Sequence, residues 1–139
     1  MGRGKKVQKT RTVLLIDDEV PWLEAMSLAM QKESYKIITA ESGEAAIKTL
    51  QQKKPDIILS DVRMPVMNGF DLFEQVRRIP KLKDVPFIFM SSLDDYDARK
   101  TAKELGADDY VEKPYDTEDV KHIVLDLLTR FKNKQASIP

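Results

Sequence analysis

The chain has 139 residues, of which 42% are hydrophobic and 33% charged, so it is long and apolar enough to form one globular domain with a core. It contains no cysteine, which excludes disulfides, thiolate metal sites and cysteine nucleophiles and agrees with a cytoplasmic location. No apolar run reaches about 18 residues, so we expect no membrane-spanning helix and no association with a membrane.

The net charge is zero, but the charges are unevenly distributed along the chain. Residues 1–11 contain five basic side chains and no acid, whereas residues 12–131 hold all the acids of the protein. We predict a basic, disordered arm at 1–11, one domain at 12–131, and a C-terminal tail or the start of a linker at 132–139. The arm has no aromatic side chain that could stack on bases, so direct binding of nucleic acid is not expected.

Short apolar runs alternate along the chain with stretches of helical spacing. The runs predict strands at 12–16, 36–40, 57–60, 87–90 and 109–111. Apolar side chains that recur every three or four positions predict helices after each run, most clearly after residue 117. Pro21 suits the first turn of the first helix, and Asp94, Asp95 and Asp97 suit the start of the fourth, where acids are favoured by the helix dipole.

Five repeats of strand and helix predict parallel βαβ units with right-handed crossovers. The first, third and fourth runs are continuously apolar, as in strands covered on both faces, whereas the second and fifth are more mixed, as at sheet edges. We therefore predict an α/β fold, a flavodoxin-like (βα)5 doubly wound parallel sheet with strand order 2-1-3-4-5. Such sheets bind ligands at the carboxyl ends of their strands.

Polar side chains gather where the predicted strands end. Asp17 and Asp18 follow the first strand, Asp61 the third, Ser91 the fourth and Lys113 the fifth. Three neighbouring carboxylates repel one another, and a hard divalent cation such as Mg²⁺ relieves that repulsion through oxygen ligands. A carboxylate beside such a metal can act as a nucleophile and form an aspartyl phosphate. The sequence therefore predicts a phosphoryl-transfer site.

Each of these features also has an ordinary structural explanation. An acid pair after a strand often caps the next helix, and a Lys-Pro pair after a strand usually belongs to a loop. A chance arrangement would not be expected to place all of them at successive strand ends, so we interpret them as one site.

Four stretches of the chain resemble the receiver domain of two-component response regulators: VLLIDDE, PDIILSDVRMPVMNG, VPFIFMSS and GADDYVEKP. The resemblance covers about residues 12–131. It implies a phosphorelay signalling switch rather than an enzyme, one that promotes its own phosphorylation and only slowly dephosphorylates itself. It also implies a sensor histidine kinase or a histidine phosphotransfer protein as phosphoryl donor, and an output partner or domain that the sequence does not identify.

The resemblance assigns the metal and the acceptor residue by residue. Asp61 is the phosphoacceptor, and it holds Mg²⁺ (with Mn²⁺ as an alternative) together with Asp17, Asp18 and the backbone carbonyl of Arg63. The position of Arg63 is one at which the family tunes dephosphorylation, and an arginine there predicts slowed hydrolysis. Gly69 is expected to shape the loop after Asp61.

The same resemblance assigns the switch. Ser91 and Lys113 bind the phosphoryl group, and Tyr110 moves inward when Ser91 shifts. The Lys113–Pro114 peptide bond is expected to be cis, a state that only X-Pro bonds adopt cheaply. The surface formed by the fourth helix, fifth strand and fifth helix then changes, and two copies of the chain could pair through it.

Two alternatives remain at this stage. One is a Mg²⁺-dependent hydrolase with an aspartate nucleophile, of the haloacid-dehalogenase type; such enzymes carry Asp-x-Asp, whereas this chain has Asp61-Val62-Arg63. The other is a pseudo-receiver that acts only as a binding module, against which the complete set of Asp18, Asp61, Ser91 and Lys113 argues.

Overall fold

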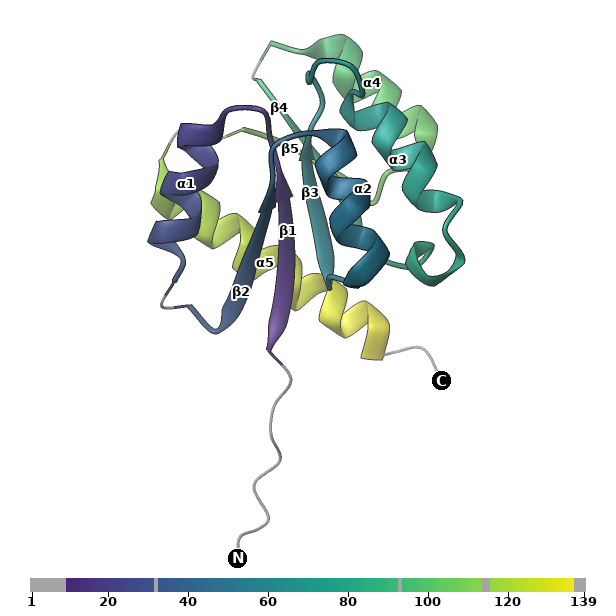
Figure 1. Cartoon of the computed structure of the whole chain (residues 1–139). Helices are drawn as coiled ribbons and strands as arrows, with labels where there is room; N and C mark the ends of the chain where they lie inside the picture. The colour runs from purple at the N-terminus through teal and green to yellow at the C-terminus, as the bar shows by residue number, and fades with distance from the viewer. Residues whose placement is uncertain (1–9, 32, 93, 114–115, 137–139) are drawn as a thin grey trace, which may run out of the picture.

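A computed structural model describes residues 10–31, 33–92, 94–113 and 116–136 of the chain. It contains a five-stranded parallel sheet, as predicted (Figure 1). The strands are β1 (Arg11–Ile16), β2 (Tyr35–Ala40), β3 (Ile57–Asp61), β4 (Phe87–Ser91) and β5 (Asp109–Glu112). Their order in the sheet is β2-β1-β3-β4-β5, which confirms the predicted flavodoxin-like topology.

Helices cover both faces of the sheet. They are α1 (Val20–Ala29), α2 (Gly43–Gln52), α3 (Gly69–Arg77), α4 (Tyr96–Leu105) and α5 (Thr117–Ala136), with a short 3₁₀ turn at Pro80–Leu82. Buried residues of α2, α3 and α4 pack on one face, and those of α1 and α5 pack on the other (Figure 1). The fold is therefore a three-layer α/β/α sandwich.

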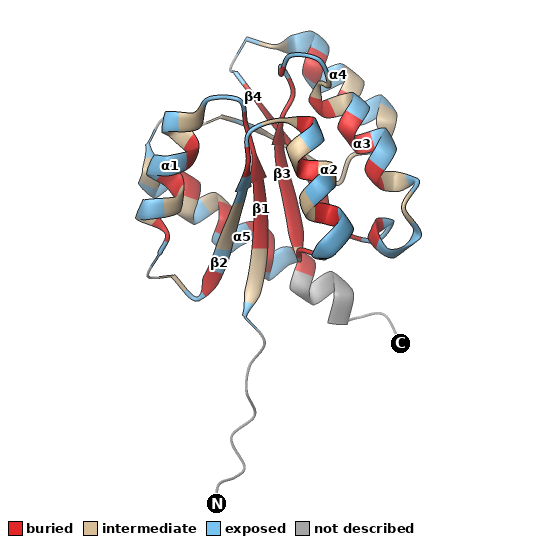
Figure 2. Ribbon diagram, viewed as in Figure 1, coloured by how far each residue is buried: buried red, intermediate tan, exposed pale blue. Residues whose placement is uncertain are grey.

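The core follows the apolar runs of the sequence (Figure 2). β3 and β4 are buried at every position, as is β1 from Val13 onward, because helices cover both of their faces. β2 and β5 lie at the edges and are less completely buried, as their mixed composition predicts. On the face of α2, α3 and α4, Phe73 packs edge-on against Phe87, with ring centroids 5.1 Å apart.

Side-chain caps define where several helices begin. The hydroxyl of Ser42 accepts the backbone N–H of Ala45 at the start of α2. Asn68 and Asp71 form a capping box at the start of α3, in which each side chain accepts the other residue's backbone N–H. Asp95 caps α4 through the N–H of Ala98. These caps place the first turns of α2, α3 and α4 just beyond the carboxyl ends of the strands.

Gly69 allows the loop after β3 to return close to that strand. Its N–H donates to the carbonyl of Val62 at 2.9 Å. A Cβ atom at this position would lie 2.3 Å from the carbonyl oxygen of Asp61, far inside van der Waals contact. The loop therefore needs glycine here for close approach of two backbones, as expected from the sequence.

The ends of the domain differ slightly from the expected ones. β1 begins at Arg11, inside the segment that we assigned to the arm, while residues 1–9 lie outside the described part of the chain. α5 continues to Ala136, past residue 131, because no glycine or proline interrupts the chain before Pro139. None of the helices formed by the described residues combines the length and apolar character needed to cross a membrane.

Candidate functional site

The three predicted carboxylates meet at the carboxyl ends of β1 and β3. One oxygen from each of Asp17, Asp18 and Asp61 lies within 4.8 Å of the others. Asp17 is completely buried, Asp61 is 8% exposed and Asp18 is exposed, so the cluster is most accessible to solvent at Asp18. The backbone fixes Asp17 at the end of the strand, because its N–H donates to the carbonyl of Ala40 at 3.1 Å. Sequence reasoning predicted this cluster correctly.

The electrostatics of the cluster favour the binding of a cation. Burial, together with the neighbouring charge of Asp17, raises the pKa of Asp61 to about 6, while Lys113 opposes the shift. Burial also raises the pKa of Asp17. Within the described residues, the buried Oδ2 atom of Asp17 accepts no aligned hydrogen bond. Closely spaced carboxylate oxygens, one of them a buried oxygen that, among these residues, only a lysine ammonium contacts, are a ligand set that fits Mg²⁺.

Lys113 brings a positive charge to the cluster from the end of β5. Its ammonium lies 2.5 Å from Asp17 Oδ2 and 2.5 Å from Glu19 Oε1, and 4.7 Å from the ring centroid of Trp22. Burial alone would lower the pKa of Lys113, but the bonds to Asp17 and Glu19 raise it above its ordinary value. We expected this lysine to pair with Asp61 or with a phosphoryl group. In the structure its ion pairs are with Asp17 and Glu19, and it acts on Asp61 through its charge.

Ser91 ends β4 and is almost completely buried. Its hydroxyl donates to Asp95 Oδ2 at 2.9 Å. Asp95 was recognised in the sequence only as an acid at the start of a helix, and its bond to Ser91 was missed. The spacing of four residues between a strand-end hydroxyl and a helix cap is the signal that could have indicated this contact.

Arg63, two residues after Asp61, also binds Asp95. Its Nε donates to Oδ2 and its Nη2 donates to Oδ1, each at 2.8 Å, in the bidentate geometry that arginine forms with carboxylates. The hydrogen bonds from Arg63, together with those from Ser91 and the N–H of Ala98, hold the pKa of Asp95 at about 2, although burial opposes them. The Arg63 side chain is thus engaged by a helix cap. The role of its backbone carbonyl as a metal ligand stays a prediction.

Tyr110 lies in β5, and its partly buried ring packs against the core on the α4 side of the sheet. The guanidinium of Arg99 lies over this ring, 5.0 Å from the centroid. The Tyr110 hydroxyl is buried and has no hydrogen-bond partner among the residues that the structure describes. The predicted cis bond between Lys113 and Pro114 involves a proline outside the described residues.

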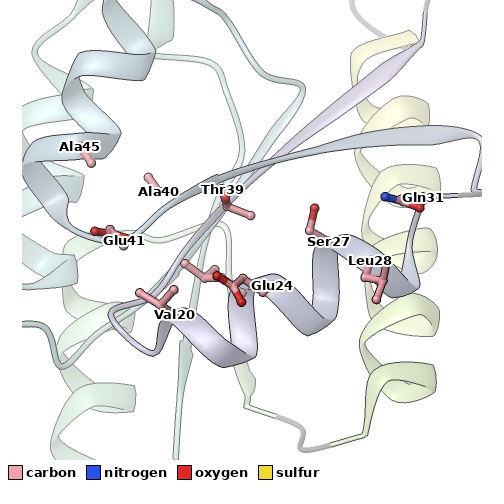
Figure 3. Close-up of a pocket in the computed structure, with 10 residues that line it drawn as sticks. Val20, Glu24, Ser27, Leu28, Gln31, Thr39, Ala40, Glu41 and Ala45 are labelled. Carbon is pink, nitrogen blue, oxygen red and sulfur yellow. The ribbon is translucent and has the colours of Figure 1, made fainter.

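A surface pocket elsewhere in the molecule is separate from the carboxylate cluster (Figure 3). It lies between α1 and the edge of the sheet, and neither the three clustered carboxylates nor Lys113 line it. Its walls include Val20, Glu24 and Leu28 from α1 and Thr39 from β2. The pocket therefore adds no group to the chemistry of the candidate site.

Comparison with known proteins gives consistent matches. The sequence model described as "Response regulator receiver domain" matches residues 13–125. The phosphate regulon transcriptional regulatory protein PhoB of Pseudomonas aeruginosa is 32% identical over 105 residues, covering 76% of this chain and 46% of that protein. The chain spans about half the length of the curated relatives that it matches.

Solved structures match over nearly their whole length. The chemotaxis response regulator CheY4 of Vibrio cholerae is 28% identical, with a TM-score of 0.76, covering 85% of this chain and 98% of that one. The signal receiver domain of a signal transduction histidine kinase from Syntrophus aciditrophicus is also 28% identical, with a TM-score of 0.74, covering 86% and 91%.

Proposed function

Since the chain belongs to the family of response regulator receiver domains, we propose that it is a phosphorelay switch that accepts a phosphoryl group on Asp61. The observation that carries this proposal is the convergence of Asp17, Asp18 and Asp61 within 4.8 Å, with Lys113 bound to one of them. Of the three carboxylates, Asp61 is the one that ends the central strand β3, and it retains an exposed edge through which a donor could reach it.

The donor that fits this chemistry is a phosphohistidine of a sensor histidine kinase or of a histidine phosphotransfer protein. A carboxylate oxygen of Asp61 attacks the phosphorus, and the bond between phosphorus and the imidazole nitrogen breaks. The electron pair of that bond stays on the imidazole, and Asp61 becomes an acyl phosphate. With a pKa of about 6, Asp61 is mostly ionised near neutral pH, and a bound cation would keep this nucleophile ionised at lower pH as well.

Asp17, Asp18, Asp61 and the backbone carbonyl of Arg63 would hold Mg²⁺, or Mn²⁺ as an alternative. When bound, the cation supplies charge neutralisation for the carboxylates and for the incoming phosphoryl oxygens. The chain's own contribution is to hold Asp17 rigidly: its N–H is bonded to Ala40, and its Oδ1 accepts the N–H of Glu19 at 2.9 Å. The ligand oxygens are therefore placed in advance.

Lys113 and Ser91 are the groups that would bind the new phosphoryl group. Lys113 is already held at the cluster, so a short movement from Asp17 or Glu19 would bring its ammonium to a phosphoryl oxygen. Ser91 would supply a hydroxyl donor from the neighbouring strand β4. Both are donors to a developing negative charge, which is the main requirement of phosphoryl transfer.

The change at Ser91 would be transmitted to the surface formed by α4, β5 and α5, with Tyr110 as the moving side chain. A homodimer through this surface is part of the proposal. In the single chain, charged groups there are already paired internally: Arg99 with Glu112 at 3.2 Å, and Arg130 with Asp109 at 2.7 Å. Pairing between copies through these four residues would therefore exchange existing ion pairs. Because relatives include transcriptional regulators, we propose that a further domain or partner reads this surface.

Labelling with acetyl phosphate tests the proposal directly. The protein is incubated with Mg²⁺ and acetyl phosphate, and intact mass should rise by about 80 Da, one phosphoryl group. The Asp61→Asn variant should show no gain, and omission of Mg²⁺ should abolish labelling of the wild type. Labelling that persists in Asp61→Asn would overturn the assignment of the acceptor. A wild type that cannot be labelled would favour a domain that acts only as a binding module.

A further inference from the structure

The carboxylate of Asp95 is saturated with donors from three different elements. Oδ2 accepts the hydroxyl of Ser91 from β4 and the Nε of Arg63 from the loop after β3. Oδ1 accepts the Nη2 of Arg63 and the N–H of Ala98 in the first turn of α4. The side chain of Asp95 thus links Ser91, Arg63 and the start of α4. Ser91 is predicted to sense phosphorylation of Asp61, and α4 is predicted to respond to it.

The geometry distinguishes this contact from an ordinary surface ion pair. The side chain of Asp95 is only 12% exposed, although that of Arg63 is 62% exposed. Ser91 is 1% exposed, so its hydroxyl depends on a protein acceptor and cannot turn to water instead. Hydrogen bonds to an ionised acceptor are about twice as strong as those between neutral groups. Asp95 therefore holds Ser91 more firmly than a neutral cap would.

We propose that Asp95 is a positioning residue that occupies the hydroxyl of Ser91 and the guanidinium of Arg63 until a phosphoryl group on Asp61 competes for them. The inference rests on the proposed phosphorylation of Asp61. Asp95 presents the same kind of acceptor, an anion with two oxygens, that the phosphoryl group later presents. Among the hydrogen bonds of the described residues, Ser91 and Arg63 both donate to Asp95 and neither donates to Asp61.

This arrangement couples the two states of the site to α4. When Ser91 turns toward a phosphoryl group, Asp95 keeps its bond to Ala98 but loses its link to β4. When Arg63 also leaves, the loop after β3 and the start of α4 are no longer joined. The start of α4 then becomes free to shift, and the energy needed to break these bonds subtracts from the affinity for the phosphoryl group.

Beryllium fluoride, which binds to carboxylates as an analogue of a phosphoryl group, provides the test. It is titrated in Mg²⁺ against the wild type, Asp95→Asn and Asp95→Ser, with binding followed by the amide NMR signals of Val62 and Ser91. Both substitutions keep a good helix cap but remove the charge, so the helix should remain intact. We expect each variant to bind between about threefold and thirtyfold more tightly than the wild type, since neither the hydrogen bond to a charged carboxylate nor the ion pair with Arg63 need be broken.

Asp97→Asn is the matched control, because Asp97 is an exposed acid in the first turn of the same helix and its loss changes the net charge equally. Its affinity for beryllium fluoride should stay within about twofold of the wild type. A second comparison uses Ser91→Ala, which removes the donor itself. If Asp95 acts by holding Ser91, the gain from Asp95→Asn should shrink in the Ser91→Ala background, whereas a purely structural role would leave it unchanged.

The outcomes separate this inference from the function on which it rests. Tighter binding by both Asp95 variants, with Asp97→Asn unchanged and the gain reduced by Ser91→Ala, supports the positioning role. Suppose that the wild type binds beryllium fluoride and is labelled on Asp61, but the Asp95 variants bind no more tightly than the wild type. That result overturns the role proposed for Asp95 and leaves the proposed function intact. Failure of the wild type both to bind and to be labelled overturns the proposed function, and this inference falls with it.

Discussion

Lys113 and Asp17 form an ion pair of 2.5 Å between the ends of an edge strand and a central strand, at the buried side of the carboxylate cluster. Asp17 is completely buried, so its charge is compensated mainly by this lysine. Lys113 consequently opposes the effect of burial on the pKa of Asp17, and through its charge it also lowers the pKa of Asp61.

Removal of the charge at position 113 should raise the pKa of Asp61. Lys113 lowers that pKa, so in a Lys113→Met variant without metal the value should rise above the wild-type value of about 6. Carboxyl-carbon NMR of Asp61 during a pH titration measures this directly. Glu19→Gln serves as the control, since it leaves Lys113 paired with Asp17 and should shift the titration less. An unchanged titration in Lys113→Met would show that the lysine does not act on Asp61.

Asp61→Asn should stabilise the protein in the absence of metal at neutral pH. The pKa of Asp61 in the folded state, about 6, is higher than its ordinary value of 3.8, so protonation of Asp61 favours the folded state. The stability contributed by the protonated carboxyl is fully present below about pH 4 and is lost as the pH rises through about 6. The asparagine variant avoids that loss, and its free energy of unfolding should exceed that of the wild type by about 1–3 kcal/mol at about pH 7.5.

Urea unfolding of both proteins across this pH range measures the difference. Asp84→Asn, at an exposed position, is the control and should follow the wild type. If the free energies of unfolding of Asp61→Asn and the wild type changed with pH in the same way, the raised pKa of Asp61 would be contradicted.

Mg²⁺ should stabilise the folded protein, and more strongly at about pH 7.5 than at about pH 5, because protons compete with the cation for Asp61. Thermal unfolding with and without MgCl₂ measures the effect, with NaCl at matched ionic strength as the control. Removal of one of the three ligands in Asp18→Asn should reduce the stabilisation. The same increase in melting temperature in both proteins would place the ion elsewhere.

Trp22 should report occupation of the site. It is the single tryptophan of the chain, and the ammonium of Lys113 lies 4.7 Å from its ring centroid. A cation bound at Asp17 would compete with Lys113 for that carboxylate, so the charge above the ring should move and the emission should change. Fluorescence titration with Mg²⁺ checks this, and Lys113→Met should lose most of the response. A response of equal size in that variant would mean that the lysine does not carry the signal.

Gly69→Ala should destabilise the protein, because the added Cβ would lie 2.3 Å from the backbone oxygen of Asp61 and backbone must move to accommodate it. We expect a loss of about 2–4 kcal/mol in the free energy of unfolding, measured with urea. Gly106→Ala is the comparison. Its φ of +80° disfavours alanine, but no atom beyond the adjoining residues of the chain lies within 4 Å of the new methyl group, so the cost should be only about 1 kcal/mol. Equal losses would show that strain in the loop after β3 relaxes freely.

The topology and the carboxylate cluster could be predicted because both depend on local patterns. Continuous apolar runs marked the central strands, and the residue that follows each run must lie at one edge of a parallel sheet. Asp17, Asp18 and Asp61 were therefore brought together by position along the chain alone. The strand ends agreed with the predicted ones to within a residue or so.

The contact of Arg63 with Asp95 and the contact of Lys113 with Glu19 could not be predicted in the same way. Arg63 reaches Asp95 only because the loop after β3 and the start of α4 approach each other in space, which no spacing in the sequence encodes. Lys113 has several carboxylates within reach, and its choice of Asp17 and Glu19 depends on the exact path of the chain after β5. The ion pairs of long, flexible charged side chains depend on tertiary geometry. Sequence patterns therefore predict which part of the fold such a side chain lies in, but not which carboxylate it binds.

The sheet keeps two apolar cores apart, one with α2, α3 and α4 and the other with α1 and α5. Lys113 contacts α1 through Trp22, whereas Ser91 and Tyr110 contact α4 and the core beside it. Substitutions on the helices of opposite cores share no packing partners within these two clusters, so their effects on stability should add. The proposed responding surface takes α4 from one core and α5 from the other, so the two helices can vary independently of each other and each needs to remain compatible only with its own core.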